Sequence, residues 1–366
     1  LRSRCDFEAI ITEREVKQLK GVFGALICLV LFQSLPAAGE TANAGDVEQK
    51  VAVQWLQKMV KAIQTESYQG RSIFHNGNRM MSLKVMHGMI DGEPWDRVVH
   101  LSGEPAEVLR KGDKISCLHP ESTVELSAEK NKLQAAKIPL LNAFNDGKLA
   151  IPDRYQLRMG REGRVAGRAV QLINIIPVDR ARYGYQLGLD KSTGLLLKTV
   201  MLNQKGKALE VFEFVDIAIG ESLSKEDFAP GKGVKWLETA DSGLSKEGRD
   251  GNESNDARDS AVSPAVQKIG WAAKWLPQGF NLAENSIRNI DGVNVNTQVY
   301  SDGLAAFTIF MEKLDRVENI EGSKQRGATV ALSRRLAKPN DHFLVTVVGE
   351  VPMETAMQVA ASVVKD

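Results

Sequence analysis

Cysteine is scarce in this chain, which has three in 366 residues: Cys5, Cys28 and Cys117. The first two lie in or just before an N-terminal apolar segment, so Cys117 is the one thiol of the remaining chain. A single thiol cannot form an internal disulfide, which excludes a disulfide framework. Cys117 lies in the segment Lys114–His119, in which apolar and polar residues alternate as in a strand. In this setting it is more typical of a small buried hydrophobe than of a nucleophile.

An excess of charge of one sign is also absent. The chain has 47 basic and 46 acidic residues and a formal net charge of +1. Residues 1–44 hold equal numbers of both, so the net charge is the same without them. Nucleic-acid binding needs a strongly basic footprint. The sequence therefore predicts no nucleic-acid partner.

Catalytic and metal-binding motifs are missing as well. No GxSxG, HExxH, Walker or GxGxxG pattern occurs. Ser127 with Lys130, and Ser222 with Lys225, have the spacing of a serine–lysine pair but fall in polar connections. The five histidines show no paired ligand spacing. The sequence predicts a binding protein rather than an enzyme, with no catalytic residue, no metal site and no cofactor.

The chain also lacks a hydrophobic run long enough for a comfortable membrane span of about 20 residues. The apolar run Gly21–Leu35 carries no charge, follows Lys17 and Lys20, and precedes a stretch of mostly small residues ending at Ala44. This order is typical of a secretory signal peptide, with cleavage after Ala44 or a few residues earlier. A buried core helix is the alternative. The sequence thus predicts export, with residues 1–44 as the signal region.

Residues 1–15 do not fit a signal peptide, because they carry four acidic side chains. We expect translation to begin near Val16 or Leu19, so that residues 1–15 are not natural.

The next part of the chain predicts one helix followed by an antiparallel sheet. Apolar residues in 46–65 recur at helical spacing. Asn76-Gly77 and Asp91-Gly92 separate short alternating runs and are strong hairpin signals. Further strands follow up to Ile219, and a short helix is expected at Leu140–Asn145. The expected N-terminal domain is 45–232.

A polar segment then separates a second unit. Residues 240–260 contain Leu244 as their one large apolar residue, which is too little to offset the entropy of ordering. We expect a flexible linker at 233–263 and a C-terminal domain at 264–366 with five strands and a helix at about 354–364. The predicted fold class is α+β, mainly antiparallel β.

Two features could contact ligands. The alternation of side chains along the predicted strand Arg79–Ile90 places Met81, Leu83, Val85 and Met89 on one face. Such a face can line a lipid cavity, although apolar faces of this kind more often pack a core. Arg154, Arg158 and Arg161 begin a run of five arginines in 15 residues, which could grip anionic groups or be a solvated hairpin surface.

Several segments resemble the RseB/MucB family of periplasmic regulators of the envelope-stress sigma factor. They include, in order, Tyr68-Gln69-Gly70, Leu101-Ser102-Gly103-Glu104-Pro105, Glu107-Val108-Leu109-Arg110, Trp275-Leu276-Pro277, Tyr300-Ser301-Asp302-Gly303-Leu304 and Val347-Val348-Gly349-Glu350-Val351-Pro352.

The resemblance implies an N-terminal open, unclosed β-barrel similar to the lipoprotein carriers of the Lol system, and a smaller C-terminal α+β domain. It implies a negative regulator that binds the periplasmic domain of a RseA/MucA-like membrane anti-sigma factor and shields it from proteolysis. Lipid or lipopolysaccharide would compete with that binding. A periplasmic lipid or lipoprotein carrier is the alternative, and homo-oligomer formation is left open.

Overall fold

The computed structural model describes residues 44–365 except 104, 113, 121–152, 232–233, 239–269, 291–292, 315–320 and 339–340. The expected signal region, apart from Ala44, and the helix expected at Leu140–Asn145 lie outside these residues. None of the helices that the structure describes is long and apolar enough to cross a membrane.

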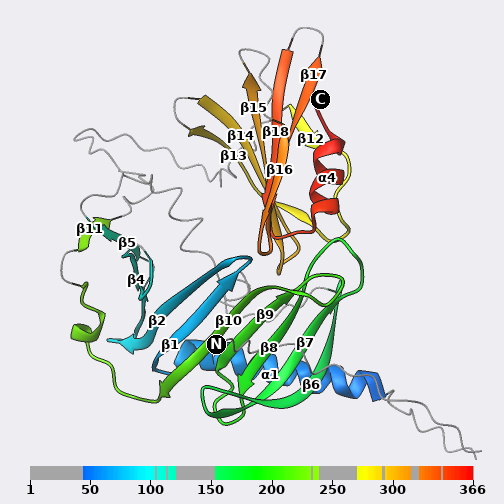
Figure 1. Ribbon diagram of the computed structural model, residues 1–366. Helices are drawn as coiled ribbons and strands as arrows, with labels where there is room; N and C mark the ends of the chain where they lie inside the picture. The colour runs from blue at the N-terminus through cyan, green and yellow to red at the C-terminus, as the bar shows by residue number, and fades with distance from the viewer. Residues whose placement is uncertain are drawn as a thin grey trace, which may run out of the picture. The chain divides into compact units, whose positions relative to one another are not determined.

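An eleven-stranded antiparallel sheet forms the larger unit (Figure 1). Its strand order is β11-β5-β4-β3-β2-β1-β10-β9-β8-β7-β6. The strands are β1 (Tyr68–Asn76), β2 (Arg79–Ile90), β3 (Glu93–His100), β4 (Glu107–Lys111), β5 (Lys114–Pro120), β6 (Tyr155–Val165), β7 (Arg168–Pro177), β8 (Gly184–Asp190), β9 (Leu196–Leu202), β10 (Ala208–Ile219) and β11 (Val234–Glu238). The outermost strands, β11 and β6, are not paired with each other, so the sheet is open as expected.

Local sequence explains the hairpins of this sheet. Two-residue connections join β1 to β2 and β2 to β3, with Asn76 opposite Arg79 and Ile90 opposite Glu93. Asp91 and Gly92 both have positive φ, the conformation that tight hairpin turns require and that these residue types tolerate. The hairpins predicted at these positions are confirmed.

Helix α1 (Ala44–Thr65) packs its apolar side on one face of the sheet. Leu56 and Met59 are fully buried against strands β6 to β9, where Leu157, Ile173 and Leu187 belong to the same core cluster. A second cluster continues this face, the helix-facing side, toward β1, β2 and β10. A third cluster lies around Met86 on the opposite side of β2, where the short 3-10 helix η1 (Lys225–Phe228) inserts Phe228.

The smaller unit is a six-stranded antiparallel sheet with a helix, in the order β13-β14-β15-β18-β17-β16. Its strands are β13 (Asn281–Ile290), β14 (Val293–Ser301), β15 (Ala306–Leu314), β16 (Gly322–Arg326), β17 (Thr329–Lys338) and β18 (Asp341–Gly349). Helix α4 (Met353–Ser362) buries Ala356, Val359 and Ala360 against this sheet. The final residues form β19 (Val363–Lys365), which pairs with β12 (Trp271–Ala273).

The predicted linker at 233–263 needs a correction at its start. Val234–Glu238 form strand β11, which pairs with β5 over Ser116–Pro120. This pairing satisfies backbone groups that β5 would otherwise present as a free edge. The rest of the predicted linker lies outside the described residues.

The turn after β8 contains a buried carboxylate, Asp190, which makes the stability of the fold depend on pH. The side chain of Asp190, 2% exposed, accepts hydrogen bonds from Arg168 Nε at 2.6 Å and from the Thr193 backbone N–H at 2.8 Å. Burial alone would raise the pKa of Asp190, but bonds from Arg168, Ser192 and Thr193 outweigh it and hold the pKa well below the usual range. A carboxylate with a lowered folded-state pKa stabilises the fold above the unfolded pKa of about 3.9, and that stability is lost as pH falls toward the folded value.

We expect Asp190→Asn to lower the free energy of unfolding at neutral pH, because the amide keeps the shape and loses the charge. The difference from the wild-type protein should shrink below about pH 4. Urea unfolding over a pH series measures this. A difference that stays constant through the acid range would show that the carboxylate charge is not the cause.

Candidate functional site

The predicted lipid-contacting residues lie on β2, and the sheet adds partners from neighbouring strands. Met81 is opposite Phe74 of β1, and Val85 is opposite Val98 of β3, which is opposite Val108 of β4. We call this group the apolar wall; it comprises Phe74, Met81, Leu83, Val85, Val98 and Val108. All six are half-buried, and Phe74 and Val85 pack against the helix-facing cluster around Phe212 and Phe214.

Met89, the fourth predicted residue, differs from the others. Strand alternation places it on the same side of β2, but near the hairpin that ends at Ile90. It is 41% exposed and belongs to none of the core clusters of the described residues. The structure therefore brings Met81, Leu83 and Val85 together and leaves Met89 at the margin of the wall.

The predicted arginine contacts lie at the opposite edge of the sheet. Arg154 immediately precedes edge strand β6 and is half-buried, whereas Arg158 and Arg161 are exposed on β6. Arg161 falls in an irregular stretch between Met159 and Glu162. Among the described residues no ion pair joins these three arginines to a carboxylate.

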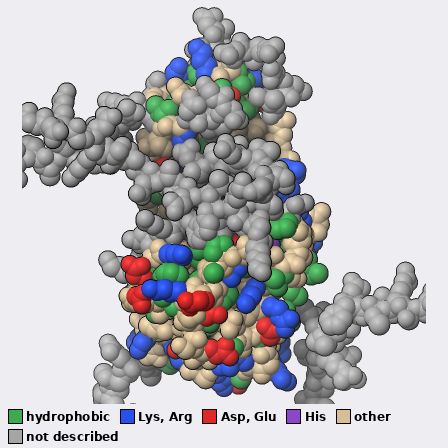
Figure 2. All heavy atoms as spheres, turned by 90° about the vertical axis from the view of Figure 1, so that its left-hand side faces the viewer, with side chains coloured by type: hydrophobic (Ala, Val, Ile, Leu, Met, Phe, Trp, Pro, Cys, Tyr) green, Lys and Arg blue, Asp and Glu red, His purple; other side chains and the backbone are tan. Residues whose placement is uncertain are grey.

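Charge elsewhere is mixed in sign. On the face shown in Figure 2, acidic and basic side chains are interspersed among apolar ones. Within the described part of the chain, no group of three or more His, Cys, Asp or Glu side chains is arranged to hold a metal ion.

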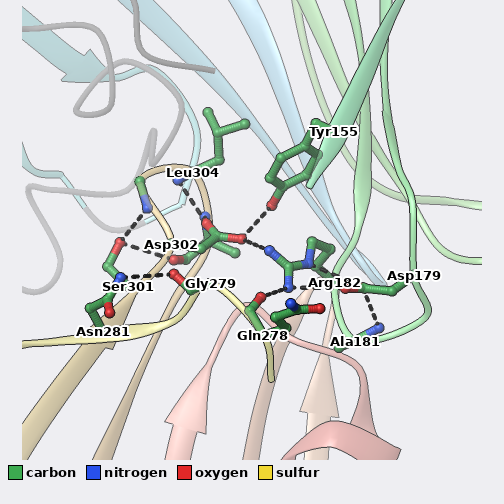
Figure 3. A network of polar contacts seen from close by, with 12 residues as sticks. Tyr155, Asp179, Ala181, Arg182, Gln278, Gly279, Asn281, Ser301, Asp302 and Leu304 are labelled. Carbon is green, nitrogen blue, oxygen red and sulfur yellow. Dashed lines mark hydrogen bonds and ion pairs between the residues drawn. The ribbon is translucent and has the colours of Figure 1, made fainter. Parts of the chain in front are cut away.

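Sequence reasoning missed a buried ion pair that joins the two sheet units (Figure 3). Arg182, in the connection between β7 and β8, has a fully buried side chain and forms an ion pair with Asp302, whose side chain is also fully buried. Asp302 follows β14 of the smaller unit. The Tyr155 hydroxyl of β6 donates to the same carboxylate at 3.0 Å.

The rest of the Arg182 guanidinium is also satisfied. It donates to both oxygens of Asp179 at 3.1 Å and to the backbone oxygen of Gln278 at 2.6 Å, as Figure 3 shows. The rings of Tyr155 and Phe280 lie 5.5 and 5.1 Å from its central carbon. Burial works to lower the pKa of Arg182, but the bond to Asp179 and the charge of Asp302 outweigh it and raise the pKa. A planar cation with this many partners is held in one orientation.

The second oxygen of Asp302 fixes its own loop. It accepts from the backbone N–H groups of Leu304 at 2.9 Å and Ala305 at 2.8 Å. This holds Leu304 where it packs into the core cluster of α1 and β6 to β9. The ion pair and the apolar contact therefore reinforce each other.

A further contact forms at the turn between β16 and β17. The backbone N–H of Ala328 donates to Glu210 of β10 at 3.1 Å, and Ala328 is fully buried in the same cluster as Leu304. Gly327 has φ +57°, and a Cβ there would lie 2.3 Å from the side-chain oxygen of Asn76. Glycine is thus required for this close approach.

Comparison with known proteins gives matches along nearly the whole chain. Residues 51–232 match the model of the MucB/RseB N-terminal domain, and residues 265–364 match that of the MucB/RseB C-terminal domain. The sigma factor AlgU regulatory protein MucB of Pseudomonas aeruginosa is 30% identical over 344 residues, covering 92% of this chain and 96% of that protein.

Two other matches agree. The sigma-E factor regulatory protein RseB of Haemophilus influenzae is 26% identical and covers 95% of this chain and 99% of its own. A crystal structure of MucB in complex with MucA(peri) is 27% identical, with a TM-score of 0.66, covering 86% of this chain and 99% of that one.

Proposed function

Because the chain belongs to the MucB/RseB family, we propose that it is a periplasmic negative regulator of a sigma-E-type envelope stress response. It binds the periplasmic domain of a RseA/MucA-like membrane anti-sigma factor and protects that domain from proteolysis. The proposal includes no catalytic step, in keeping with relatives that are named as regulatory proteins.

One observation carries the proposal. The chain matches MucB along both of its sheet units, and MucB has been solved in complex with MucA(peri). The match includes the segments that provide Arg182 and Asp302, which lie within residues 51–232 and 265–364 respectively. The buried Arg182–Asp302 pair and the packing of Leu304 connect the two units. This connection supports a binding surface for the anti-sigma factor that includes residues of both units.

Protection from proteolysis tests this function. The purified periplasmic domain of the anti-sigma factor from the same organism is incubated with its site-specific protease, with and without the chain. We expect saturating chain to slow cleavage strongly, and heat-unfolded chain to have no effect. Cleavage at the same rate with folded chain would overturn the proposal.

We further propose that an acylated lipid releases the anti-sigma factor by binding at the apolar wall. The support is a half-buried apolar surface on the helix-facing side of an open sheet. Arg154, Arg158 and Arg161 could contact anionic groups of such a lipid. A ligand shifts an equilibrium only by its difference in affinity for the two states, so anti-sigma factor and lipid must weaken each other equally.

We also propose that the two units are domains, at about 45–238 and 264–366, joined by the remaining polar segment. Limited proteolysis should cut first between them.

The wall also favours a second function, that of a periplasmic lipid or lipoprotein carrier. Deleting the gene distinguishes the two. Loss of a regulator changes transcription that depends on the stress sigma factor, whereas loss of a carrier mislocalises lipoproteins.

A further inference from the structure

Strand β2 carries a large share of the chain's methionines. Its twelve residues include Met80, Met81, Met86 and Met89, four of the ten methionines in the sequence. Ten methionines spread evenly over 366 residues would place less than one in a strand of this length. Pairing with β1 and β3 holds these side chains on defined faces of the sheet. The methionine cluster is therefore a property of this one strand.

Core packing explains the methionines elsewhere but not those of β2. Outside β2, five of the six belong to a core cluster or pack against one: Met59, Met159, Met201, Met311 and Met353. In β2, Met86 is in a core cluster, whereas Met80, Met81 and Met89 are in none of those formed by the described residues. Methionine ordinarily fills irregular space inside a core. These three side chains therefore call for another explanation.

Strand alternation divides the four methionines between the two faces of the sheet. Met81 and Met89 lie on the helix-facing side, and Met80 and Met86 lie on the other. Met81 belongs to the apolar wall, opposite Phe74, and Met89 lies at the margin of the wall. A thioether therefore stands toward each end of the wall along β2.

The exposed fractions of the four side chains form a graded series. Met80 is 68% exposed, Met89 is 41% exposed and Met81 is half-buried. Met86 is 1% exposed and shares its core cluster with Phe228 of η1. Oxidants in solution act first on the accessible sulfur atoms. The strand thus presents three accessible thioethers and shields the fourth.

Oxidation replaces the apolar thioether with a polar sulfoxide. With a hypohalous acid, a bond forms between sulfur and the acid's oxygen while the oxygen–halogen bond breaks. Sulfur loses two electrons, the halide leaves with them, and the proton of the acid passes to water. On exposed Met80 water solvates the new oxygen. On Met81 a ligand lying along the wall would remove that water, which costs free energy when no donor replaces it.

We propose that β2 is a site of reversible methionine oxidation, at which a hypohalous acid converts Met80, Met89 and Met81 to the sulfoxide. The two methionines of the helix-facing side, Met81 and Met89, then regulate the apolar wall; this regulation rests on the proposed lipid site. The oxidised chain binds an acyl chain more weakly. A methionine sulfoxide reductase restores the thioether, as two thiols form a disulfide and the oxygen leaves as water.

Peptide mapping tests the oxidation site. The full chain is treated with limiting hypochlorous acid, and mass spectrometry measures sulfoxide at each methionine. We expect Met80 and Met89 to react first, Met81 next, and Met86 only after unfolding in urea. Oxidation of Met86 as fast as Met80, or reaction of the core methionines ahead of those in β2, would overturn the proposal.

Titration with dodecanoate tests the regulation. Calorimetry gives the affinity of the full chain before oxidation, after it, and after treatment with methionine sulfoxide reductases for both sulfoxide epimers. We expect oxidation to weaken binding about tenfold, the cost of covering one polar oxygen without a donor, and reduction to restore it. An affinity that oxidation leaves unchanged would overturn the regulation and leave the lipid site intact.

Two variants assign the effect to one face of the strand, each compared with itself before and after oxidation. In Met81→Leu with Met89→Leu, oxidation should no longer change the affinity. Met80→Leu removes the adjacent and most exposed methionine of β2 from the opposite face, and it should keep the tenfold loss. Met357, 55% exposed on α4, stays oxidisable in both. Equal losses in the two variants would overturn the role of the helix-facing pair. Failure of the unoxidised chain to bind dodecanoate would contradict the lipid site, and its regulation with it.

Discussion

Replacing Arg182 with Met should lower the free energy of unfolding by about 3–5 kcal/mol, the cost of leaving one member of a buried ion pair without its partner. The Asp302 side chain is fully buried, and in this variant Tyr155 and two backbone N–H groups would remain as its donors, with no cation. Urea unfolding, followed by fluorescence, gives the free energy. Unfolding like that of the wild-type protein would mean that the buried pair does not form in solution.

Two further variants sharpen this result. In Arg182→Met with Asp302→Leu, both charges are absent, so the loss should be smaller than the sum of the single losses. Arg71→Met removes the partner of Asp216 from an ion pair whose side chains are 70% and 45% exposed, and it should have little effect. A large loss of stability in Arg182→Met beside a small loss in Arg71→Met would show that burial of the ion pair, rather than the breaking of any ion pair, causes the effect.

Replacing Leu83 with Asp should weaken binding of an acylated lipid on the order of 100-fold. A charge in the middle of the wall denies the acyl chain about three methylene groups, each contributing about 0.8 kcal/mol. The lipid should also displace the anti-sigma segment less effectively, because the coupling between the ligands is reciprocal. Titrating lipid and segment together by fluorescence anisotropy measures both effects.

Ser82→Asp is the matched control for this variant. Ser82 adjoins Leu83 in β2, and its side chain lies on the opposite face of the sheet. It should leave lipid affinity unchanged. Equal losses in both variants would show that added charge, rather than the wall, governs binding.

Much of the sheet could be predicted because its information is local. Alternation of apolar residues and the turns at Asn76-Gly77 and Asp91-Gly92 predicted the first hairpins, and β1 to β3 confirm them. Strand β16 was missed because all five of its residues are exposed, so it has no alternation to detect. Helical spacing predicted a helix to about residue 364, but the chain leaves the helix at Ser362 and pairs as β19 with β12.

The contacts between the units could not be predicted, because they join distant residues. Arg182 and Asp302 are 120 positions apart, and neither lies in a pattern that predicts burial of a charge. The buried contacts of His87 with Asp96 and Tyr68 were hidden for the same reason. Its partners come from the two strands that flank β2, and sequence order does not reveal the register that aligns them.

Direct binding of the anti-sigma factor tests the central claim. The full chain is titrated by calorimetry with the purified periplasmic domain of the membrane anti-sigma factor of its own organism. We predict saturable binding, which an acylated lipid weakens and which Arg182→Met reduces. Absence of binding by the folded wild-type chain would contradict the assignment as a regulator that acts through this partner.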